Sequence, residues 1–252
     1  MTPAAYSPPR HPVAKLQRRL TAWKAARPAT LRFGEPLLSI SFDDFPASAA
    51  TTGAHILESH GARGTYYASA GLAESDGPCG RNFSAADVVR LAKSGHEIAC
   101  HSFEHSDLAQ QPVFETLQDL AQNRDAMQRM GVGEGAQTLA YPYGETTSAL
   151  KRSLPPRFSS ARGVLPGLNV GRADLAQLRA FSMFGKPFAA MRAALKRAAK
   201  HNAWMIGFTH DVSDAPSPWG TSGADLDALL RTAHELGFTV LPVSAALARR
   251  LP

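Results

Sequence analysis

Short apolar runs alternate with amphipathic helical segments from residue 37 to the end of the chain. Apolar runs bounded by turn residues predict buried strands, and helical segments between them predict βα units around a parallel sheet. Seven or eight such units favour an irregular (β/α)7-type barrel, an α/β fold built as a single domain. The predicted strands span residues 37–43, 64–69, 96–102, 138–143, 159–164, 180–184, 205–210 and 238–243.

The helix predicted after residue 84 has recognisable ends. Ser84 followed by Asp87 has the spacing of a capping box, in which each side chain accepts a hydrogen bond from the backbone N–H of the other residue. Gly95 stands where a helix commonly ends in a left-handed residue. The segment from Ser222 to Gly237 repeats this arrangement, so we expect a second capped helix there.

Residues 1–35 are rich in Pro, Ala and basic side chains, and they precede the first predicted strand. Within them, residues 13–26 predict a short basic amphipathic helix. We expect residues 1–35 to be an extension outside the core and residues 36–252 to be the folded domain. Contact of this extension with a membrane surface or a partner stays open.

The charge balance first suggests a nucleic-acid partner. The 252 residues include 27 Lys and Arg against 21 Asp and Glu, a net charge of +6. Much of this excess lies in the extension and in a predicted helix at 186–201, and neither segment interleaves aromatic residues as single-strand binding platforms do. We therefore expect solvated basic surfaces and no nucleic-acid partner.

Other features concern the compartment. No apolar run reaches the length of a membrane span, and the N-terminal residues lack the apolar core of a signal peptide. Cys79 and Cys100 are too few for a disulfide framework. Together these features predict a protein of the reducing cytoplasm.

Two polar clusters at predicted strand ends indicate a metal site. Asp43 and Asp44 follow one apolar strand, and adjacent carboxylates repel each other unless a cation holds one of them. His101 and His105 follow another strand, and imidazoles at this spacing converge on one ion if the chain turns helically there. One carboxylate and two imidazoles favour Zn, with Co, Ni, Mn or Fe as alternatives.

Two further strand ends supply candidate groups. His210 follows an apolar strand, and by itself it is equally well explained as a hydrogen-bonded structural histidine. The turn at Tyr143 and Gly144 presents backbone N–H groups that could bind an oxyanion, and an ordinary Pro-Gly turn is the alternative. Cys100 adjoins His101, but strand alternation directs it to the opposite face.

Four segments, taken together and in order, resemble the polysaccharide deacetylase family, the NodB-homology group of chitin, chitooligosaccharide and peptidoglycan N-deacetylases. The resemblance extends from about residue 36 to about residue 248 and also covers residues 61–69. The four segments are Ser41-Phe42-Asp43-Asp44, His101-Ser102-Phe103-Glu104-His105, Ala140-Tyr141-Pro142-Tyr143-Gly144 and Phe208-Thr209-His210-Asp211.

The resemblance implies a role for each of these polar groups. One divalent metal ion would be held by Asp44, His101 and His105. Asp43 would be the general base that activates water, and His210 the general acid that protonates the departing amine. The backbone N–H of Tyr143 would help to hold the oxyanion.

The implied activity is hydrolysis of an N-acetyl group on an amino sugar, oligosaccharide or polysaccharide, with release of acetate. Pro142, Gly144 and Trp219 are expected to contact this N-acetylated carbohydrate, Trp219 by stacking on a sugar ring. Two alternatives remain. The first alternative is a deacylase or deformylase of another linear amide, such as a lipid-linked amino sugar. The second is an inactive carbohydrate-binding relative.

The chain departs from the family pattern at two places. Many members have, at the position of Ala140, an arginine that orients the catalytic aspartate, so another group must position Asp43 here, with Arg63 and Arg162 as candidates. A family motif with Asp and Trp near the acetyl pocket is not evident. Asp174 is a weak candidate for its acidic residue, and Trp204 or Trp219 for its aromatic residue.

Overall fold

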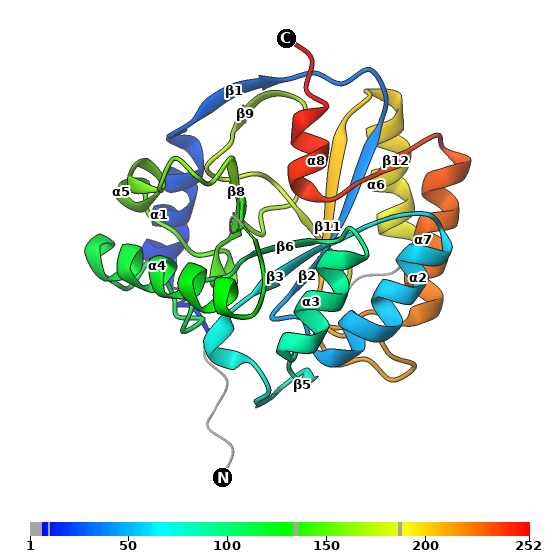
Figure 1. Cartoon of the computed structure of the whole chain (residues 1–252). Coiled ribbons are helices and arrows are strands. Elements are labelled where there is room, and N and C mark those ends of the chain that lie inside the picture. The colour runs from blue at the N-terminus through cyan, green and yellow to red at the C-terminus, as the bar shows by residue number, and fades with distance from the viewer. Residues whose placement is uncertain (1–6, 10, 134–135, 186–187) are drawn as a thin grey trace.

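A parallel sheet of eight strands, curled into a half-barrel, forms the centre of the molecule (Figure 1). The computed structural model describes residues 7–9, 11–133, 136–185 and 188–252. The predicted fold class is confirmed, and a strand lies at each predicted position. Across the sheet the order is β10 (Phe181–Ser182), β11 (Trp204–Thr209), β2 (Leu37–Asp43), β3 (Thr65–Ala68), β6 (Glu97–Cys100), β7 (Thr138–Ala140) and β8 (Ser160–Arg162), and β12 (Thr239–Val240) also pairs with β2.

Helices connect the strands and cover the sheet. In Figure 1, one group of helices lies on the right of the molecule and another on the left, while α8 (Val243–Ala248) lies near the start of β2. The right-hand group is α2 (Ala54–Ser59), α3 (Ala85–Lys93), α6 (Phe188–Lys200) and α7 (Gly223–Glu235). The left-hand group is α1 (Pro12–Trp23), α4 (Val113–Arg129) and α5 (Ser148–Ser153).

Short elements complete the chain. A π-helical turn at Ala49–Gly53 precedes α2, and 3-10 turns lie at Ala70–Leu72 and Pro142–Gly144. Strands β4 (Asp76–Gly77) and β5 (Gly80–Arg81) form a small hairpin.

The predicted capping box is present at the start of α3. Ser84 accepts a hydrogen bond from the backbone N–H of Asp87, and the Asp87 side chain accepts one from the backbone of Ser84. Gly95, just after this helix, has a φ of 85°, which a glycine adopts without the steric cost that a side chain would add. The helix limits read from the sequence are therefore confirmed here.

Strand β2 is the centre of the core, because all seven of its residues are buried. It pairs with β11 on one side and with β3 on the other, and helices cover the sheet. Ligand sites of parallel α/β folds lie at the carboxyl ends of such strands. The position of β2 therefore brings Asp43 and Asp44 to the edge where β3, β6, β7 and β11 also end.

Part of the predicted extension belongs to the folded core. Strand β1 (Pro28–Leu31) pairs antiparallel with β9 (Gly171–Asp174), and Leu31 is fully buried in a cluster that contains Trp204. A boundary at residue 35 therefore does not separate the extension from the domain, because this pairing depends on residues far along the chain. Residues 1–6 and 10 of the predicted extension lie outside the described residues.

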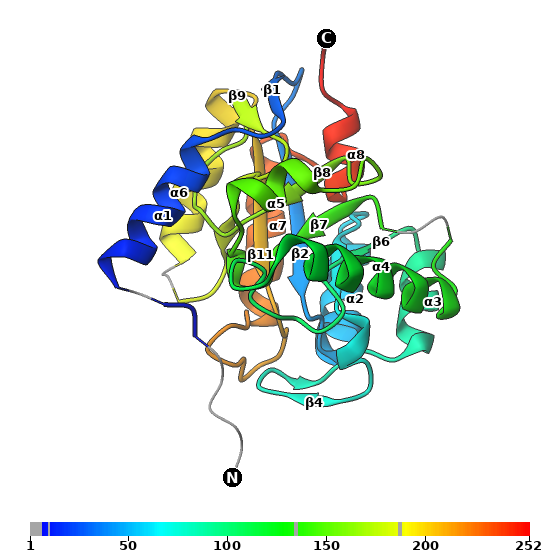
Figure 2. The same cartoon turned by 90° about the vertical axis from the view of Figure 1, so that its left-hand side faces the viewer.

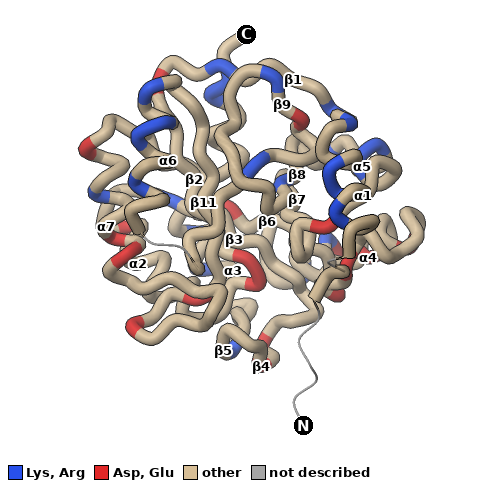
Figure 3. Tube along the Cα trace, turned by 180° about the vertical axis from the view of Figure 1, so that it is seen from behind, with Lys and Arg blue, Asp and Glu red and all other residues tan. Residues whose placement is uncertain are grey.

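Lys and Arg positions gather along α1 and α6 (Figure 3), and most of those on these two helices are exposed. Helix α6 corresponds to the predicted helix at 186–201, of which residues 186–187 lie outside the described residues. Within the described part of the chain, none of the helices combines the length and the apolar character needed to cross a bilayer.

Candidate functional site

Asp44, His101 and His105 converge at the carboxyl ends of β2 and β6. One oxygen or nitrogen atom from each of the three lies within 4.8 Å of the others. The distance to Oδ1 of Asp44 is 3.2 Å from Nε2 of His105 and 3.7 Å from Nε2 of His101. The structure thus brings together the three side chains for which the motifs predicted metal binding.

Unusual backbone conformations direct these side chains. Asp44, Ser102, His105 and Tyr143 have φ values of 55°, 65°, 52° and 58°, in the left-handed region that non-glycine residues seldom adopt. The turn after His101 is not helical; left-handed residues in a loop bring the two imidazoles together instead. Such conformations cost free energy and gather at functional sites, where the surrounding fold enforces them.

Hydrogen bonds orient the His101 imidazole and hold the loop that leads to His105. Nδ1 of His101 lies 2.8 Å from the carbonyl oxygen of Ala140, so neutral His101 carries its proton on Nδ1 and turns Nε2 toward Asp44. The loop that leads to His105 is held by Asp119 of α4. Its carboxylate accepts hydrogen bonds from the backbone N–H groups of Phe103, at 2.7 Å, and Glu104, at 3.0 Å. No local sequence pattern identifies Asp119, because its partners are backbone groups of a loop 15–16 positions away.

The electrostatics of the cluster fit a divalent cation. Burial lowers the pKa of His101 to about 3 and that of His105 to about 4, so both are neutral near pH 7 and keep a lone pair for a ligand. Burial raises the pKa of Asp44 to about 7, and its buried Oδ1 accepts no hydrogen bond. A cation would satisfy this oxygen, and the N, N, O donor set suits Zn, Co, Ni, Mn or Fe.

Asp43 points to a different partner, the guanidinium group of Arg162 at the end of β8. Nη2 of Arg162 donates to Oδ1 of Asp43, and the two side chains are 0% and 6% exposed. Arg162 also lies between two rings, with its Cζ 4.7 Å from the centroid of Tyr67 and 4.9 Å from that of Phe208. The rings exclude water from the ion pair, which strengthens it.

Of the two arginines that the sequence offered for this position, Arg162 is the one that contacts Asp43. Arg63 instead donates to the backbone carbonyls of Ser94 and Ala62. Ala140 and Arg162 are direct neighbours in the β7–β8 ladder. The guanidinium group therefore comes from the strand next to the one that bears it in many family members.

The net effect of this surrounding on Asp43 is a lowered pKa. Burial alone would raise the pKa of Asp43, but the positive charge of Arg162 more than compensates. Asp43 is therefore ionised at neutral pH and able to accept a proton.

His210 follows β11 and interacts electrostatically with both Asp43 and Asp44. Its Nδ1 lies 3.1 Å from the backbone carbonyl oxygen of Trp219, which fixes the ring and leaves Nε2 as the other exchangeable position. The partner that orients His210 is thus a backbone carbonyl. The loop from 211 to 221 carries it, and Asp211 stabilises this loop by accepting hydrogen bonds from the backbone N–H and hydroxyl of Ser217.

The turn at Pro142–Gly144 borders the metal cluster. The Tyr143 ring centroid lies 4.7 Å from that of His105. Gly144 has a φ of 73°, and a Cβ at this position would lie 2.3 Å from Cγ2 of Val164, so only glycine fits. Pro142 is buried, and Trp219 is 39% exposed on its loop.

Two residues that were candidates for the missing family motif, Asp174 and Trp204, have structural roles instead. The Asp174 carboxylate accepts hydrogen bonds from the backbone N–H groups of Ala26 and Arg27 and forms an ion pair with buried Lys151 at 2.9 Å. Trp204 is fully buried and donates to Ser39. Asp174 thus fastens the N-terminal segment to the domain, and Trp204 belongs to the core.

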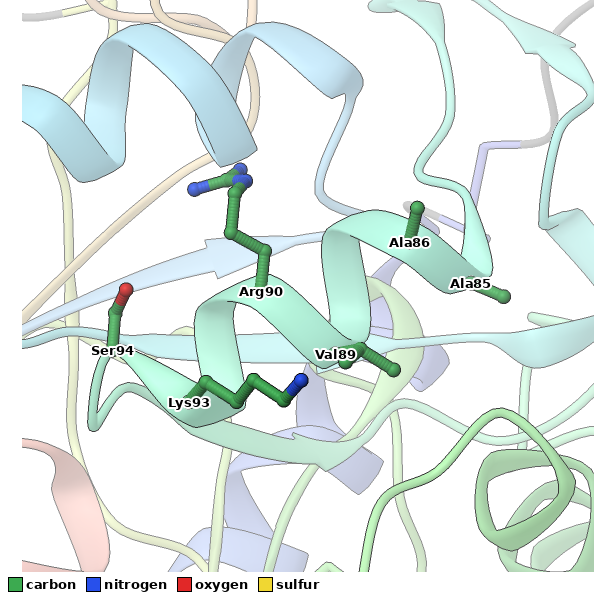
Figure 4. Close-up of a pocket in the computed structure, with 6 residues that line it drawn as sticks. All are labelled: Ala85, Ala86, Val89, Arg90, Lys93 and Ser94. Carbon is green, nitrogen blue, oxygen red and sulfur yellow. The ribbon is translucent and has the colours of Figure 1, made fainter.

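A cavity of about 600 Å³ over α3 is separate from this site (Figure 4). None of the side chains that line it is a predicted site residue, and the guanidinium group of Arg90 already donates to the carbonyl oxygen of Ala50. The lining consists of Ala85, Ala86, Val89, Arg90, Lys93 and Ser94.

The polysaccharide deacetylase family model matches residues 31–154. This range contains the first three of the four segments on which the resemblance rests, and the resemblance is confirmed over this part of the chain. The segment that ends in His210 and Asp211 lies beyond the matched residues. A comparison with curated proteins finds no match.

Solved structures with a similar fold cover most of the chain. A mutant of the peptidoglycan deacetylase PdaC from Bacillus subtilis is 16% identical over 86% of this chain and 92% of that chain, with a TM-score of 0.57. A family 4 acetyl xylan esterase from Clostridium thermocellum, in complex with a cobalt ion, is 20% identical over 84% and 90%, with a TM-score of 0.60. At these identities the likeness establishes the fold.

A third similar structure is a mutant of a CE4 family pseudoenzyme with restored enzymatic activity. It is 11% identical over 87% of this chain and 71% of that chain, with a TM-score of 0.60. The same fold thus occurs in proteins described as enzymes and in one described as a pseudoenzyme. Activity in this chain must therefore be argued from its own side chains.

Proposed function

We propose that this protein is a metal-dependent hydrolase that removes N-acetyl groups from an amino sugar, oligosaccharide or polysaccharide and releases acetate. The observation that carries the proposal is the arrangement of five side chains at one edge of the sheet. Asp44, His101 and His105 form a three-ligand cluster, and Asp43 and His210 stand beside it with separate partners.

Hydrolysis of an acetamide requires an activated water, stabilisation of the developing oxyanion and a proton for the leaving nitrogen. A divalent ion bound by the three ligands would act as a Lewis acid on the acyl oxygen and lower the pKa of a bound water. Asp43 is held ionised by Arg162 and accepts the proton of the attacking water. The carboxylate cannot turn away, because the buried guanidinium group fixes it.

The later steps fall to His210 and the turn after β7. The contact between His210 and the Trp219 carbonyl fixes the imidazole, so that the protonated ring delivers its proton to the departing amine. In this proposal the backbone N–H of Tyr143 assists in holding the oxyanion; the support is that its residue borders the metal cluster, with its ring centroid 4.7 Å from that of His105. Pro142, Gly144 and Trp219 contribute surface for the sugar.

Metal content and acetate release test this proposal together. Purified protein, reconstituted in turn with Zn, Co, Ni, Mn and Fe, should bind about one equivalent of metal and release acetate from a panel of N-acetylated oligosaccharides. His101→Ala and His105→Ala should lose both properties, whereas Asp43→Asn should lose turnover and keep the metal. His55→Ala, at an exposed histidine on α2, is the matched control and should behave as the wild type.

Contrary results would separate the alternatives. Failure to bind metal stoichiometrically would overturn the proposal. Metal binding with sugar binding, but without acetate release for any metal, would make the protein an inactive carbohydrate-binding relative. Release of formate or of another acyl group from a non-acetylated amide would identify a deacylase of a different linear amide.

A further inference from the structure

Helix α1 exposes an apolar face to solvent. Val13, Leu16, Leu20 and Trp23 follow the spacing of one helical face, and their exposed fractions are 58%, 56%, 46% and 81%. The ten steps of helix from Val13 to Trp23 make this apolar face about 15 Å long. In Figure 2, α1 lies at the outer edge of the molecule.

The opposite side of α1 holds the helix on the domain through small and polar groups. Ala14 is buried, Arg18 forms an ion pair with Glu145, and the carbonyl oxygen of Thr21 accepts a hydrogen bond from buried Lys151. An amphipathic helix normally turns its apolar face to the core. Here the polar side faces the domain and the apolar side faces outward, so the fold leaves the apolar face available to something else.

The charge around the apolar face indicates which kind of partner it fits. Exposed Lys15 and Arg19 lie on one side of the face and exposed Lys24 on the other, and the first acidic residue of the chain is Glu35. A second copy of the chain would bring two such basic helices together and be repelled. An anionic lipid surface attracts the cations and accepts the apolar side chains, which is the pattern of helices that lie in a membrane interface.

The surface next to Trp23 also combines exposed apolar side chains with basic groups. A cavity of about 410 Å³ lies between the end of α1 and the segment before β10, and its lining includes Trp23, Leu165, Leu168, Arg172 and Arg179. Leu165 is itself 36% exposed. Asp174 also lines the cavity, but its carboxylate is paired with buried Lys151. The two arginines beside exposed apolar side chains therefore suit phosphate headgroups next to acyl chains.

We propose that the outward face of α1, defined by Val13, Leu16, Leu20 and Trp23 and bordered by Lys15, Arg19 and Lys24, docks the protein reversibly on anionic lipid membranes. The helix lies in the plane of the interface and does not cross it. Arg18 ties α1 to Glu145, just after the Pro142–Gly144 turn, so the docking helix is joined to a segment that borders the candidate site. The docking itself does not depend on the proposed hydrolysis.

Vesicle sedimentation of the full chain tests the proposal. The wild type should bind vesicles of equal parts phosphatidylcholine and phosphatidylglycerol, should release them at high salt, and should not bind phosphatidylcholine alone. Leu16→Ser/Leu20→Ser and Lys15→Glu/Arg19→Glu should each weaken binding by about tenfold or more. Emission from Trp23 should shift to shorter wavelength on binding, because the indole leaves water.

Matched controls lie elsewhere on the surface. Phe114→Ser removes an apolar side chain that is 70% exposed on α4, and Lys93→Glu reverses an exposed charge on α3. Both controls should bind vesicles as the wild type does, and thermal unfolding should be the same for every variant, because all the altered side chains are in solvent.

Three outcomes would overturn the proposal. The first is absence of binding by the wild type, and the second is equal binding by the α1 variants. The third is a concentration-dependent dimer that the Leu16→Ser/Leu20→Ser variant abolishes, with no effect on vesicles; the apolar face would then be an interface between two copies.

Discussion

Replacing Arg162 by methionine removes the cation that faces Asp43 and keeps most of the side-chain volume. The two charged side chains are 0% and 6% exposed, so the interaction is that of a buried pair. Removing one partner of a buried pair costs ~3–5 kcal/mol, compared with at most ~1 kcal/mol for a surface pair. We therefore expect the free energy of unfolding at pH 7 to fall by about 3–5 kcal/mol.

The same change should be visible in catalysis. Burial raises the pKa of Asp43 and Arg162 is the main group that lowers it, so removal of the cation leaves burial unopposed. An opposite charge at this range lowers a carboxyl pKa by ~1–3 units, and the acid limb of the pH profile of kcat/KM should move upward by about that amount. The loss of stability should shrink as the pH falls, because protonated Asp43 no longer needs a cation.

The assays are acetate release across pH for the metal-loaded enzyme and urea unfolding across the same range. Arg162→Lys keeps a positive charge without the planar guanidinium group and should give a smaller shift. In the exchange variant Ala140→Arg/Arg162→Ala, the guanidinium group comes from the neighbouring strand, and the acid limb should return toward its original position. An unchanged acid limb and unchanged stability in Arg162→Met would refute the reasoning.

Two other predictions concern supports of the site, and a third concerns a buried histidine, His96, that pairs with Glu58. Asp119→Ala frees the loop before His105 and should weaken metal affinity by ~10–100-fold in competition titrations, whereas Asp125→Ala on the same helix should not. In Gly220→Ala the new Cβ would lie 2.4 Å from the Asp211 carboxylate and displace the loop that orients His210; kcat should fall by about 100-fold with metal content unchanged. Burial lowers the pKa of His96, so its contribution to stability is present above about pH 6.5 and is lost as the pH falls; urea unfolding of His96→Gln should depend less on pH between about 7 and 5.

Local information accounts for the parts of this fold that were predictable. The apolar runs, the capping box at Ser84 and the turn at Gly95 are set by residues within a few positions of one another, and the structure contains them where the sequence indicates. The motifs that end in Asp44, His101 and His105 also lie within short segments. Their meeting at one edge follows from the rule that parallel strands end together.

Tertiary structure alone decided which groups support those side chains. Arg162 reaches Asp43 across 119 positions of sequence, and Asp119 holds the His105 loop from a helix. Their partners lie far away in sequence or are backbone groups, which resemble every other backbone group in the chain. The fold likewise decided that α1 turns its apolar face outward, because helical periodicity shows that a face is apolar but does not show which side the domain covers.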